Sequence, residues 1–391
     1  VVAATNTPNS LTIWIPAEIT GRTAEAATLL SDQLIAAGNQ FPDVQLQVDG
    51  NKPVAGAGGT LSYLRSGRGV APAILPDLML LPNDQLDAVA KEDLIVPLDN
   101  LVSSELFEPL YTDALAQARP AEVTLGYPVL ISNLTHLAYD GSTIPNTLPA
   151  DWTALLSDNG RSLILPAPAA GADSATLLLQ FYLAANGTLV DASGDAPTFQ
   201  MQLDPLIFAL NQLSIARNSG FILSQSSSTV SFNEAWSRFA ASTPPNMLLT
   251  TAEQFLLQRE TVPNLGFAPI SGPGGALTPL VDGMSWVIPA RDPQRRILAA
   301  NYHAVLATAE NVGTLSQANG LLPTRRDAFS VWPTDDPYIL FLQAELERAQ
   351  PNPLTNRTTA VTVLGDAVFD VLSLTQPPMA AAEEAIQAIQ P

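Results

Sequence analysis

The chain has 391 residues, and its 17 basic and 37 acidic side chains give a formal net charge of −20. A field this negative repels phosphate backbones and anionic lipid surfaces, which argues against a nucleic-acid-binding or membrane-surface protein. The absence of cysteine excludes disulfides, thiol catalysis and cysteine-ligated zinc, and two histidines leave little room for a histidine-rich metal site.

Short apolar strands alternate with amphipathic helices in the first third of the chain, which indicates an α/β fold. A small, polar leader over residues 1–10 comes first. The pattern then predicts strands over 11–15, 44–48 and 77–81, and helices over 23–38 and 60–69. A helical stretch over 103–119 leads to strand signals within 122–139.

The rest of the chain is richer in helices. Asp173 or Ser174 is expected to cap one helix, and Asp204 followed by Pro205 is expected to open another. Further helices are predicted over 151–157, 232–241, 292–308, 358–372 and 377–389. Strands are predicted over 162–165, 246–249, 265–269 and 285–289. The pattern favours a large acidic α/β protein with two lobes.

The search for catalytic motifs finds very little. The run Gly283–Val287 lacks the last glycine of a nucleophile elbow. His136 and His303, the two possible bases for a catalytic triad, both fit structural positions better. Adjacent carboxylate pairs occur, but 37 acidic residues produce such pairs by chance. The run Gly272–Gly275 follows a predicted strand and fits a turn or hinge better than a phosphate loop.

Short phrases in a fixed order along residues 10–390 carry a family resemblance. Pro42-Asp43-Val44 precedes the second strand, Gly266–Pro269 forms a crossover phrase, and Gly320–Arg325 reads Gly-Leu-Leu-Pro-Thr-Arg. In this order the chain resembles the extracellular solute-binding proteins of bacterial ABC importers, in the branch of the maltose-binding protein. It departs from that pattern at Asp140, where asparagine is usual, and in the segment before Met247.

The resemblance implies a two-lobed periplasmic-binding-protein fold, with a ligand cleft between lobes that are joined by hinge crossings. Lobe 1 would comprise residues 1–122 and 266–316, and lobe 2 residues 123–265 and 317–391. The protein would capture a solute by hinge closure and deliver it to the permease of an ABC importer. We therefore expect a monomeric binding protein outside the cytoplasm, in the periplasm or lipid-anchored at the outer face of the membrane, without enzymatic activity, cofactor, metal or nucleic-acid partner.

Ligands of such folds bind at the carboxyl ends of strands and near helix N-termini, which gives candidate positions. By position, the predicted ligand-binding residues are Trp14, Ile15, Gly59, Thr60, Asn83, Asp84, Ser132, Asn133, Thr250, Thr251, Glu253, Ser285, Trp286 and Arg325. An indole of Trp14 or Trp286 would stack on a sugar ring, and Arg325 is either a ligand clamp or an inter-lobe salt-bridge residue.

A sugar or oligosaccharide suits these positions best, since sugars need stacking rings and planar polar groups. An anion would need converging arginines, of which Arg325 is the main candidate, and a polyamine would need several carboxylates, for which Asp84 and Glu253 are the clear positions. Two other functions stay open: a carbohydrate-active enzyme such as a glycoside hydrolase, and a sensory binding protein of the same fold that does not serve transport.

Overall fold

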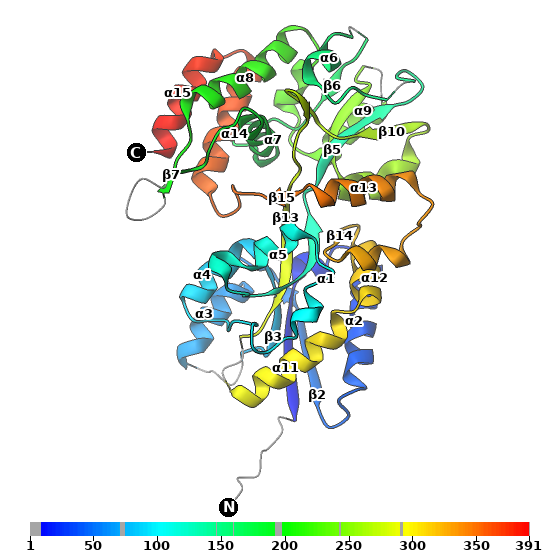
Figure 1. Cartoon of the computed structure of the whole chain (residues 1–391), viewed down its shortest axis with the longest axis vertical. Helices are drawn as coiled ribbons and strands as arrows, with labels where there is room; N and C mark the ends of the chain where they lie inside the picture. The colour runs from blue at the N-terminus through cyan, green and yellow to red at the C-terminus, as the bar shows by residue number, and fades with distance from the viewer. Residues whose placement is uncertain are drawn as a thin grey trace, which may run out of the picture. The chain divides into compact units, whose positions relative to one another are not determined.

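The computed structural model describes residues 9–70, 75–145, 147–158, 160–191, 198–241, 244–289 and 292–390. Residues 1–8 of the predicted leader lie outside this part. The chain divides into two compact units, each built from two stretches of sequence (Figure 1). Unit 1 comprises Val1–Ser132 and Val281–Glu347, and unit 2 comprises Asn133–Leu280 and Arg348–Pro391.

Unit 1 is built around a mixed sheet with the strand order β14-β4-β13-β3-β1-β2. Strand β1 is parallel to β2 and β3, whereas β13 is antiparallel to β3 and β4. The strands are β1 (Ser10–Pro16), β2 (Gln45–Lys52), β3 (Leu78–Pro82), β4 (Tyr127–Ser132), β13 (Leu280–Val287) and β14 (Leu322–Pro323). Two apolar clusters, which include Leu11 and Leu80 in one and Leu64 and Met79 in the other, form its core.

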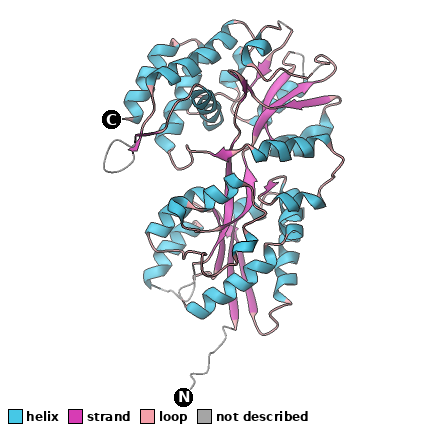
Figure 2. Ribbon diagram, in the orientation of Figure 1, coloured by secondary structure: helices cyan, strands magenta, loops and turns pink. Residues whose placement is uncertain are grey.

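Helices flank this sheet, as Figure 2 shows. The α-helices of unit 1 are α1 (Ala17–Thr20), α2 (Ala24–Gly38), α3 (Thr60–Val70), α4 (Leu86–Lys91), α5 (Thr112–Ala118), α11 (Pro293–Leu306), α12 (Ala309–Asn319) and α13 (Pro337–Glu347). Its 3-10 helices are η2 (Asn83–Gln85), η3 (Ser104–Leu106), η4 (Pro120–Glu122) and η7 (Arg326–Val331). Asp292 caps α11 as the sequence predicts, since its carboxylate accepts from the backbone N–H groups of Gln294 and Arg295.

Unit 2 contains a smaller sheet with the order β10-β5-β9-β6, in which β5 is antiparallel to both neighbours. Its strands are β5 (Thr135–Asp140), β6 (Leu163–Ile164), β9 (Met247–Thr251) and β10 (Leu265–Ala268). Further short strands are β7 (Val190–Asp191), β8 (Thr198–Phe199), β11 (Ser271–Gly272), β12 (Gly275–Ala276) and β15 (Gln350–Pro351). One large apolar cluster, with Trp152 against Phe181 and Phe221, forms the core.

Among the described residues, five α-helices of unit 2 lie in its first stretch of sequence and two in its C-terminal stretch. They are α6 (Trp152–Leu156), α7 (Ala172–Ala184), α8 (Leu203–Asn218), α9 (Phe232–Ala241), α10 (Ala252–Gln258), α14 (Thr358–Ser373) and α15 (Pro378–Ile389). The 3-10 helices are η5 (Ser224–Ser228) and η6 (Arg259–Thr261). No helix in the described ranges combines the length and apolar character needed to cross a membrane.

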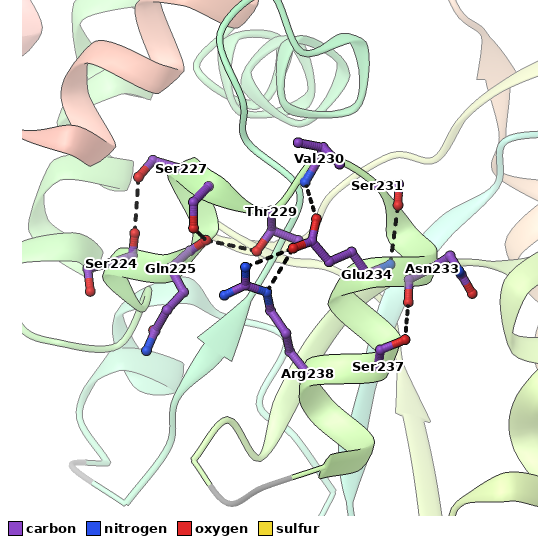
Figure 3. A network of polar contacts seen from close by, with 11 residues as sticks. Ser224, Gln225, Ser227, Thr229, Val230, Ser231, Asn233, Glu234, Ser237 and Arg238 are labelled. Atoms are coloured by element: carbon purple, nitrogen blue, oxygen red, sulfur yellow. Dashed lines mark hydrogen bonds and ion pairs between the residues drawn. The ribbon is translucent and has the colours of Figure 1, made fainter.

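The start of α9 shows how the sequence determines a helix boundary (Figure 3). Ser231 Oγ accepts from the backbone N–H of Glu234, 3.2 Å away, and the Glu234 carboxylate accepts from the N–H of Val230 at 2.8 Å. This pattern resembles a capping box, except that the Glu234 carboxylate accepts from the residue before the cap. Arg238 pairs with Glu234 one turn later, at 2.8 Å. The Val230 N–H and then Arg238 lower the pKa of the Glu234 carboxyl.

The unit boundaries differ from the predicted lobe boundaries at all three crossings. They fall after residues 132, 280 and 347 instead of 122, 265 and 316. Residues 127–132 belong to unit 1 because β4 pairs with β13 and β14. Strand β14 belongs to unit 1 because it pairs with β4. Residues 265–268 belong to unit 2 because β10 pairs with β5. Strand pairing across long sequence separations decides the first two boundaries.

Three helix predictions are also corrected. Helix α7 begins after Gly171 and is not capped by Asp173 or Ser174, since the Ser174 hydroxyl donates to the Gly171 carbonyl. Helix α8 begins at Leu203, which places Pro205 inside the first turn, where its missing N–H leaves no intrahelical bond unmade. The predicted helix over 103–119 contains only η3 and α5.

Candidate functional site

One edge of the unit 1 sheet gathers polar residues from strands far apart in the sequence. The carboxyl ends of β1, β2 and β3 meet there because these strands are parallel. Asn83 and Asp84 directly follow β3. Strand β13 is antiparallel to both β3 and β4, so that Asp282 lies opposite Ser132 and beyond the end of β3. The edge therefore brings together the predicted Asp84 and Ser132 with Asp282.

A buried polar network holds the end of β3 in place. The Ser285 hydroxyl donates to Asn83 Oδ1 at 2.6 Å, and Asn83 Nδ2 donates to Gln117 Oε1 of α5 at 3.0 Å. A Cβ atom on Gly283 would lie 2.7 Å from Asn83 Nδ2, so only glycine leaves room for this side chain. Asn83 and Ser285 were predicted to contact a ligand, and that stays a prediction; their side chains are hydrogen-bonded to each other and, through Asn83, to Gln117.

Asp84 keeps one carboxylate oxygen without a hydrogen-bond partner. Oδ2 accepts from Gln85 Nε2 at 2.9 Å, whereas the buried Oδ1 has no partner. Burial raises the pKa of the Asp84 carboxyl, and the negative charge of Asp282 raises it further. An acceptor in this state is suited to a donor brought by a ligand.

The corresponding feature of unit 2 lies at the end of β9. The Thr251 hydroxyl caps α10 by accepting from the N–H of Gln254 at 3.2 Å, which places Glu253 in the first turn. Glu253 is 7% exposed, and its Oε1 accepts from the N–H of Asn133 at 2.7 Å. Asn133 adopts φ +63°, a left-handed conformation that asparagine tolerates. The buried Oε2 of Glu253 has no partner.

Asp173, in the first turn of α7, is the second carboxylate of this region. Burial raises the pKa of Asp173 to about 6, and the charge of Glu253 contributes to the same shift. The predicted Thr250 lies three residues before Glu253. It is fully buried, and its hydroxyl donates to the carbonyl of Thr251. Glu253 and Asp173 thus form a pair of carboxyls in unit 2, as Asp84 and Asp282 do in unit 1.

The predicted aromatic contacts are core residues instead. Trp14 is 8% exposed and packs in one apolar cluster of unit 1, with the ammonium of Lys52 5.8 Å from its ring centroid. Ile15 and Trp286 are buried in the other cluster. Because Trp14 and Trp286 are buried, neither ring exposes a face on which a sugar could stack. The predicted stacking role therefore has no support in the structure.

The turn before α3 does not offer free backbone donors either. The N–H of Gly59 donates to the Gly56 carbonyl at 3.1 Å, and the N–H of Thr60 donates to the Pro53 carbonyl at 2.8 Å. A Cβ on Gly59 would lie 2.6 Å from the carbonyl oxygen of Ala55, which explains the glycine by close packing. Gly59 and Thr60 build the turn and have their donors occupied.

Arg325 is held inside unit 1. Its guanidinium makes two hydrogen bonds to the Asp327 carboxylate, at 2.9 and 2.7 Å, and donates to the Ala307 carbonyl and the Tyr127 hydroxyl. Asp327 raises the pKa of this guanidinium above its ordinary value. These contacts pack η7 against its own unit, and the predicted roles as ligand clamp or inter-lobe salt bridge stay predictions.

Replacing Arg325 by alanine is therefore expected to lower the free energy of unfolding by about 1–2 kcal/mol, because several buried hydrogen bonds are lost. Affinity for a solute should stay within about twofold of the wild type, since no binding group changes. Urea unfolding and calorimetric titration measure the two quantities. A large loss of affinity with unchanged stability would restore Arg325 to the binding site.

Sequence reasoning missed Asp282, Asp173 and Gln117. Asp282 reaches Asp84 only through strand pairing between residues about 200 positions apart. Asp173 was predicted to cap a helix, which is a common role of aspartate. Its place beside Glu253 was therefore overlooked. No group of three or more histidine, cysteine, aspartate or glutamate side chains in the described ranges is arranged to hold a metal ion.

Comparison with known proteins identifies the chain's relatives. Residues 66–340 match a family model described as bacterial extracellular solute-binding protein. A search of curated proteins found no match. Among solved structures, a cyclic alpha-maltosyl-1,6-maltose binding protein from Arthrobacter globiformis is 15% identical, with a TM-score of 0.76 over 98% of each chain.

Two further solved structures have similar folds. A maltose-bound protein of T. maritima is 15% identical, with a TM-score of 0.71 over 97% of this chain and 99% of its own. The maltose/maltodextrin-binding domain of Bdellovibrio bacteriovorus, bound to maltotriose, is 17% identical, with a TM-score of 0.67 over 97% and 98%. At these identities the similarity concerns the fold, and it agrees with a two-lobed binding-protein architecture.

Proposed function

Because the chain belongs to the family of bacterial extracellular solute-binding proteins, we propose that it captures a neutral sugar or oligosaccharide for an ABC importer. The family is one of binding proteins, so the chain is not an enzyme, and the glycoside-hydrolase alternative is set aside. It works outside the cytoplasm, where a large net negative charge limits self-association.

The observation that carries the sugar assignment is one buried carboxylate oxygen without a partner in each unit. These are Oδ1 of Asp84 in unit 1 and Oε2 of Glu253 in unit 2. Each follows a strand end, where ligands of α/β sheets bind. A hydroxyl-rich solute supplies the O–H donors that both oxygens lack. The same negative groups disfavour an anion, and Arg325 is already engaged with Asp327.

The similar folds support this ligand class. Three of these proteins are described as binding maltose, maltotriose or a cyclic maltosyl-maltose. The chain has the same division into two units, with three connecting segments at residues 132–133, 280–281 and 347–348. We propose that these segments are the hinges.

A polyamine is the second candidate, and a specific observation favours it. Each of these two carboxylates has a second carboxyl near it: Asp282 beside Asp84 and Asp173 beside Glu253. Such pairs attract ammonium groups. The pKa of Asp173 near 6 weakens this argument, because a partly protonated carboxyl also donates a hydrogen bond to a sugar hydroxyl.

Calorimetric titration of the wild-type chain against three ligand classes tests the proposal. The panel holds maltose and maltotriose with other sugars, spermidine and putrescine, and citrate and phosphate. We expect a saturable heat with at least one sugar and none with the anions. Binding of a polyamine without a response to any sugar would overturn the sugar assignment and leave a binding protein for a cation.

Two substitutions test the residues themselves. Glu253→Gln and Asp84→Asn should each weaken sugar binding about tenfold or more, since hydrogen bonds to charged groups contribute about 1.5–3 kcal/mol. Glu383→Gln, a change of an exposed carboxylate on α15, is the matched control and should leave the affinity unchanged. Equal affinities in all three variants would show that the solute binds elsewhere.

Uptake separates an importer component from a sensory protein of the same fold. Source cells that lack the chain should lose most of their high-affinity uptake of the labelled sugar, and a plasmid copy should restore it. Sugar binding in the test tube combined with unchanged uptake in these cells would favour the sensory role.

A further inference from the structure

A pocket of about 420 Å³ lies within unit 2. The elements that form it do not include α10, which carries Glu253. The second half of α7 forms one wall, the β11–β12 hairpin with the segment that follows it forms another, and Gln350 of β15 completes it. Its volume falls within the range of small-molecule sites. None of the residues proposed to bind the transported solute lines it.

Glycine conformation shapes the hairpin wall. Gly274 and Gly275 have φ values of +78° and +146°, which L side chains rarely adopt. A Cβ atom at either position would have no atom within 4 Å. Backbone conformation, and not close packing, therefore accounts for these glycines. The N–H of Gly274 is engaged, since it donates to Asp151 Oδ2 at 3.3 Å.

The hairpin is held firmly by its neighbours. The Ser271 hydroxyl donates to the Pro149 carbonyl at 2.7 Å, and the N–H of Gly272 donates to the Ala150 carbonyl at 3.1 Å. The N–H of Leu277 closes the hairpin onto the Ile270 carbonyl at 2.8 Å. The wall is thus preorganised, which reduces the ordering cost of binding.

The side-chain amide of Gln180 is buried, and one of its atoms lacks a hydrogen-bond partner. Its side chain is 3% exposed, and Nε2 donates to the Thr278 carbonyl at 2.9 Å. This bond fixes the orientation of the amide and leaves Oε1 buried without a donor. Native proteins pair nearly all such groups, so this unpaired oxygen in a residue that lines the pocket stands out.

The remaining lining defines the chemistry of the occupant. It combines the apolar Leu183, Ala184, Pro273, Ala276 and Leu277 with the neutral polar Gln180, Thr278 and Gln350 and with glycine backbone. None of these lining side chains is ionisable, in a chain with a net charge of −20. Apolar faces next to uncharged hydrogen-bonding groups match a sugar ring with its hydroxyls, and not an ion.

We propose that this pocket is a second carbohydrate site, for a neutral monosaccharide unit, separate from the site for the transported solute. Leu277 and Gln350 lie within three residues of the boundaries at 280–281 and 347–348. The Arg348 guanidinium donates to the Leu277 carbonyl at 2.6 Å, and the N–H of Gln350 donates to the Pro279 carbonyl at 2.9 Å. A bound sugar would therefore lie a few residues along the chain from two of the three segments that connect the units.

Amide NMR of the full-length, deuterated chain tests the proposal with glucose and maltotriose as probes. Saturable shifts are expected for the amides of Gly274, Gly275 and Ala276 and for the Gln180 side-chain amide. Spermidine and citrate should not produce them. The absence of these shifts with every sugar, at concentrations up to tens of millimolar, would overturn the proposal. This result needs only the wild-type chain.

Two variants locate the binding. Ala184→Phe fills the pocket from an exposed position on α7 and should abolish the shifts, and Gln180→Leu should weaken binding at least tenfold. Ala388→Phe, at an exposed position on α15, is the matched control and should leave the shifts unchanged. Persistence of the shifts in Ala184→Phe would contradict the assignment.

The measurements distinguish a failure of the pocket proposal from a failure of the proposed function. In Glu253→Gln, hairpin shifts that persist while the calorimetric heat falls support two separate sites. Hairpin shifts that disappear together with the heat would show one shared site and overturn the second one. A hairpin response in a chain that binds no solute by calorimetry would overturn the proposed transport function and leave the pocket assignment standing.

Discussion

Replacing Gly365 by alanine is expected to lower the free energy of unfolding of unit 2 by about 3 kcal/mol. A Cβ on Gly365 of α14 would lie 2.5 Å from the nitrogen and 2.7 Å from the oxygen of Gly171. Both atoms belong to the backbone just before α7, so no side chain can rotate away and the helices must separate. This cost exceeds the gain of about 1 kcal/mol that alanine usually brings inside a helix.

Gly69→Ala in α3 is the matched control, because a Cβ there has no atom within 4 Å. It should be neutral or slightly stabilising. Urea unfolding followed by far-UV circular dichroism measures both variants. Equal stability of Gly365→Ala and the wild type would show that α14 and α7 do not approach each other as closely as described.

Replacing Asp113 by asparagine is expected to raise the free energy of unfolding by about 2 kcal/mol at pH 8. Asp113 in α5 is 3% exposed, and neither carboxylate oxygen accepts a well-formed hydrogen bond. Burial raises the pKa of Asp113 to about 6. A shift of about two units corresponds to about 3 kcal/mol, of which burying the asparagine amide takes back a part.

The pH dependence has a defined sign. The pKa of Asp113 is about 6 in the folded state and about 4 in an unfolded chain, so folding favours the protonated form. Its stabilising effect is complete below pH 4 and is lost as the pH rises through 6. The advantage of Asp113→Asn should therefore be largest above pH 7 and should decrease toward pH 4.

Asp204→Asn is the matched control, since Asp204 occupies the first turn of α8 but is exposed. It should change the free energy of unfolding by no more than about 0.5 kcal/mol at any pH in this range. A lower stability of Asp113→Asn at pH 8 would mean that the carboxylate is stabilised by its surroundings, with Arg326 the nearest source of positive charge.

Local patterns predict the elements well and the units less well. The capping sequence before α11 and the apolar periodicity of α2, α9 and α14 place these helices within a residue or two. The unit boundaries depend on which strands pair, and the pairing of β4 with β13 joins residues more than 150 positions apart. No local window contains that information, so the family resemblance placed the boundaries only approximately.

The candidate site shows the same division. The strand-end rule located Asp84 and Glu253, which keep unpartnered oxygens, but it also selected Trp14 and Trp286, which pack in the core. A tryptophan at a strand end faces the core or solvent according to the helices that cover it, and the strand itself does not determine this. The contacts of Arg325 were missed for a similar reason, because Asp327 and Tyr127 meet it only after folding.

The most direct test of the central claim is a crystal structure of the chain with the sugar that gives the highest calorimetric affinity. We expect sugar hydroxyl oxygens within about 2.5–3.0 Å of Asp84 Oδ1 or of Glu253 Oε2. A bound sugar that touches neither oxygen, or density for a polyamine between the paired carboxyls, would contradict it.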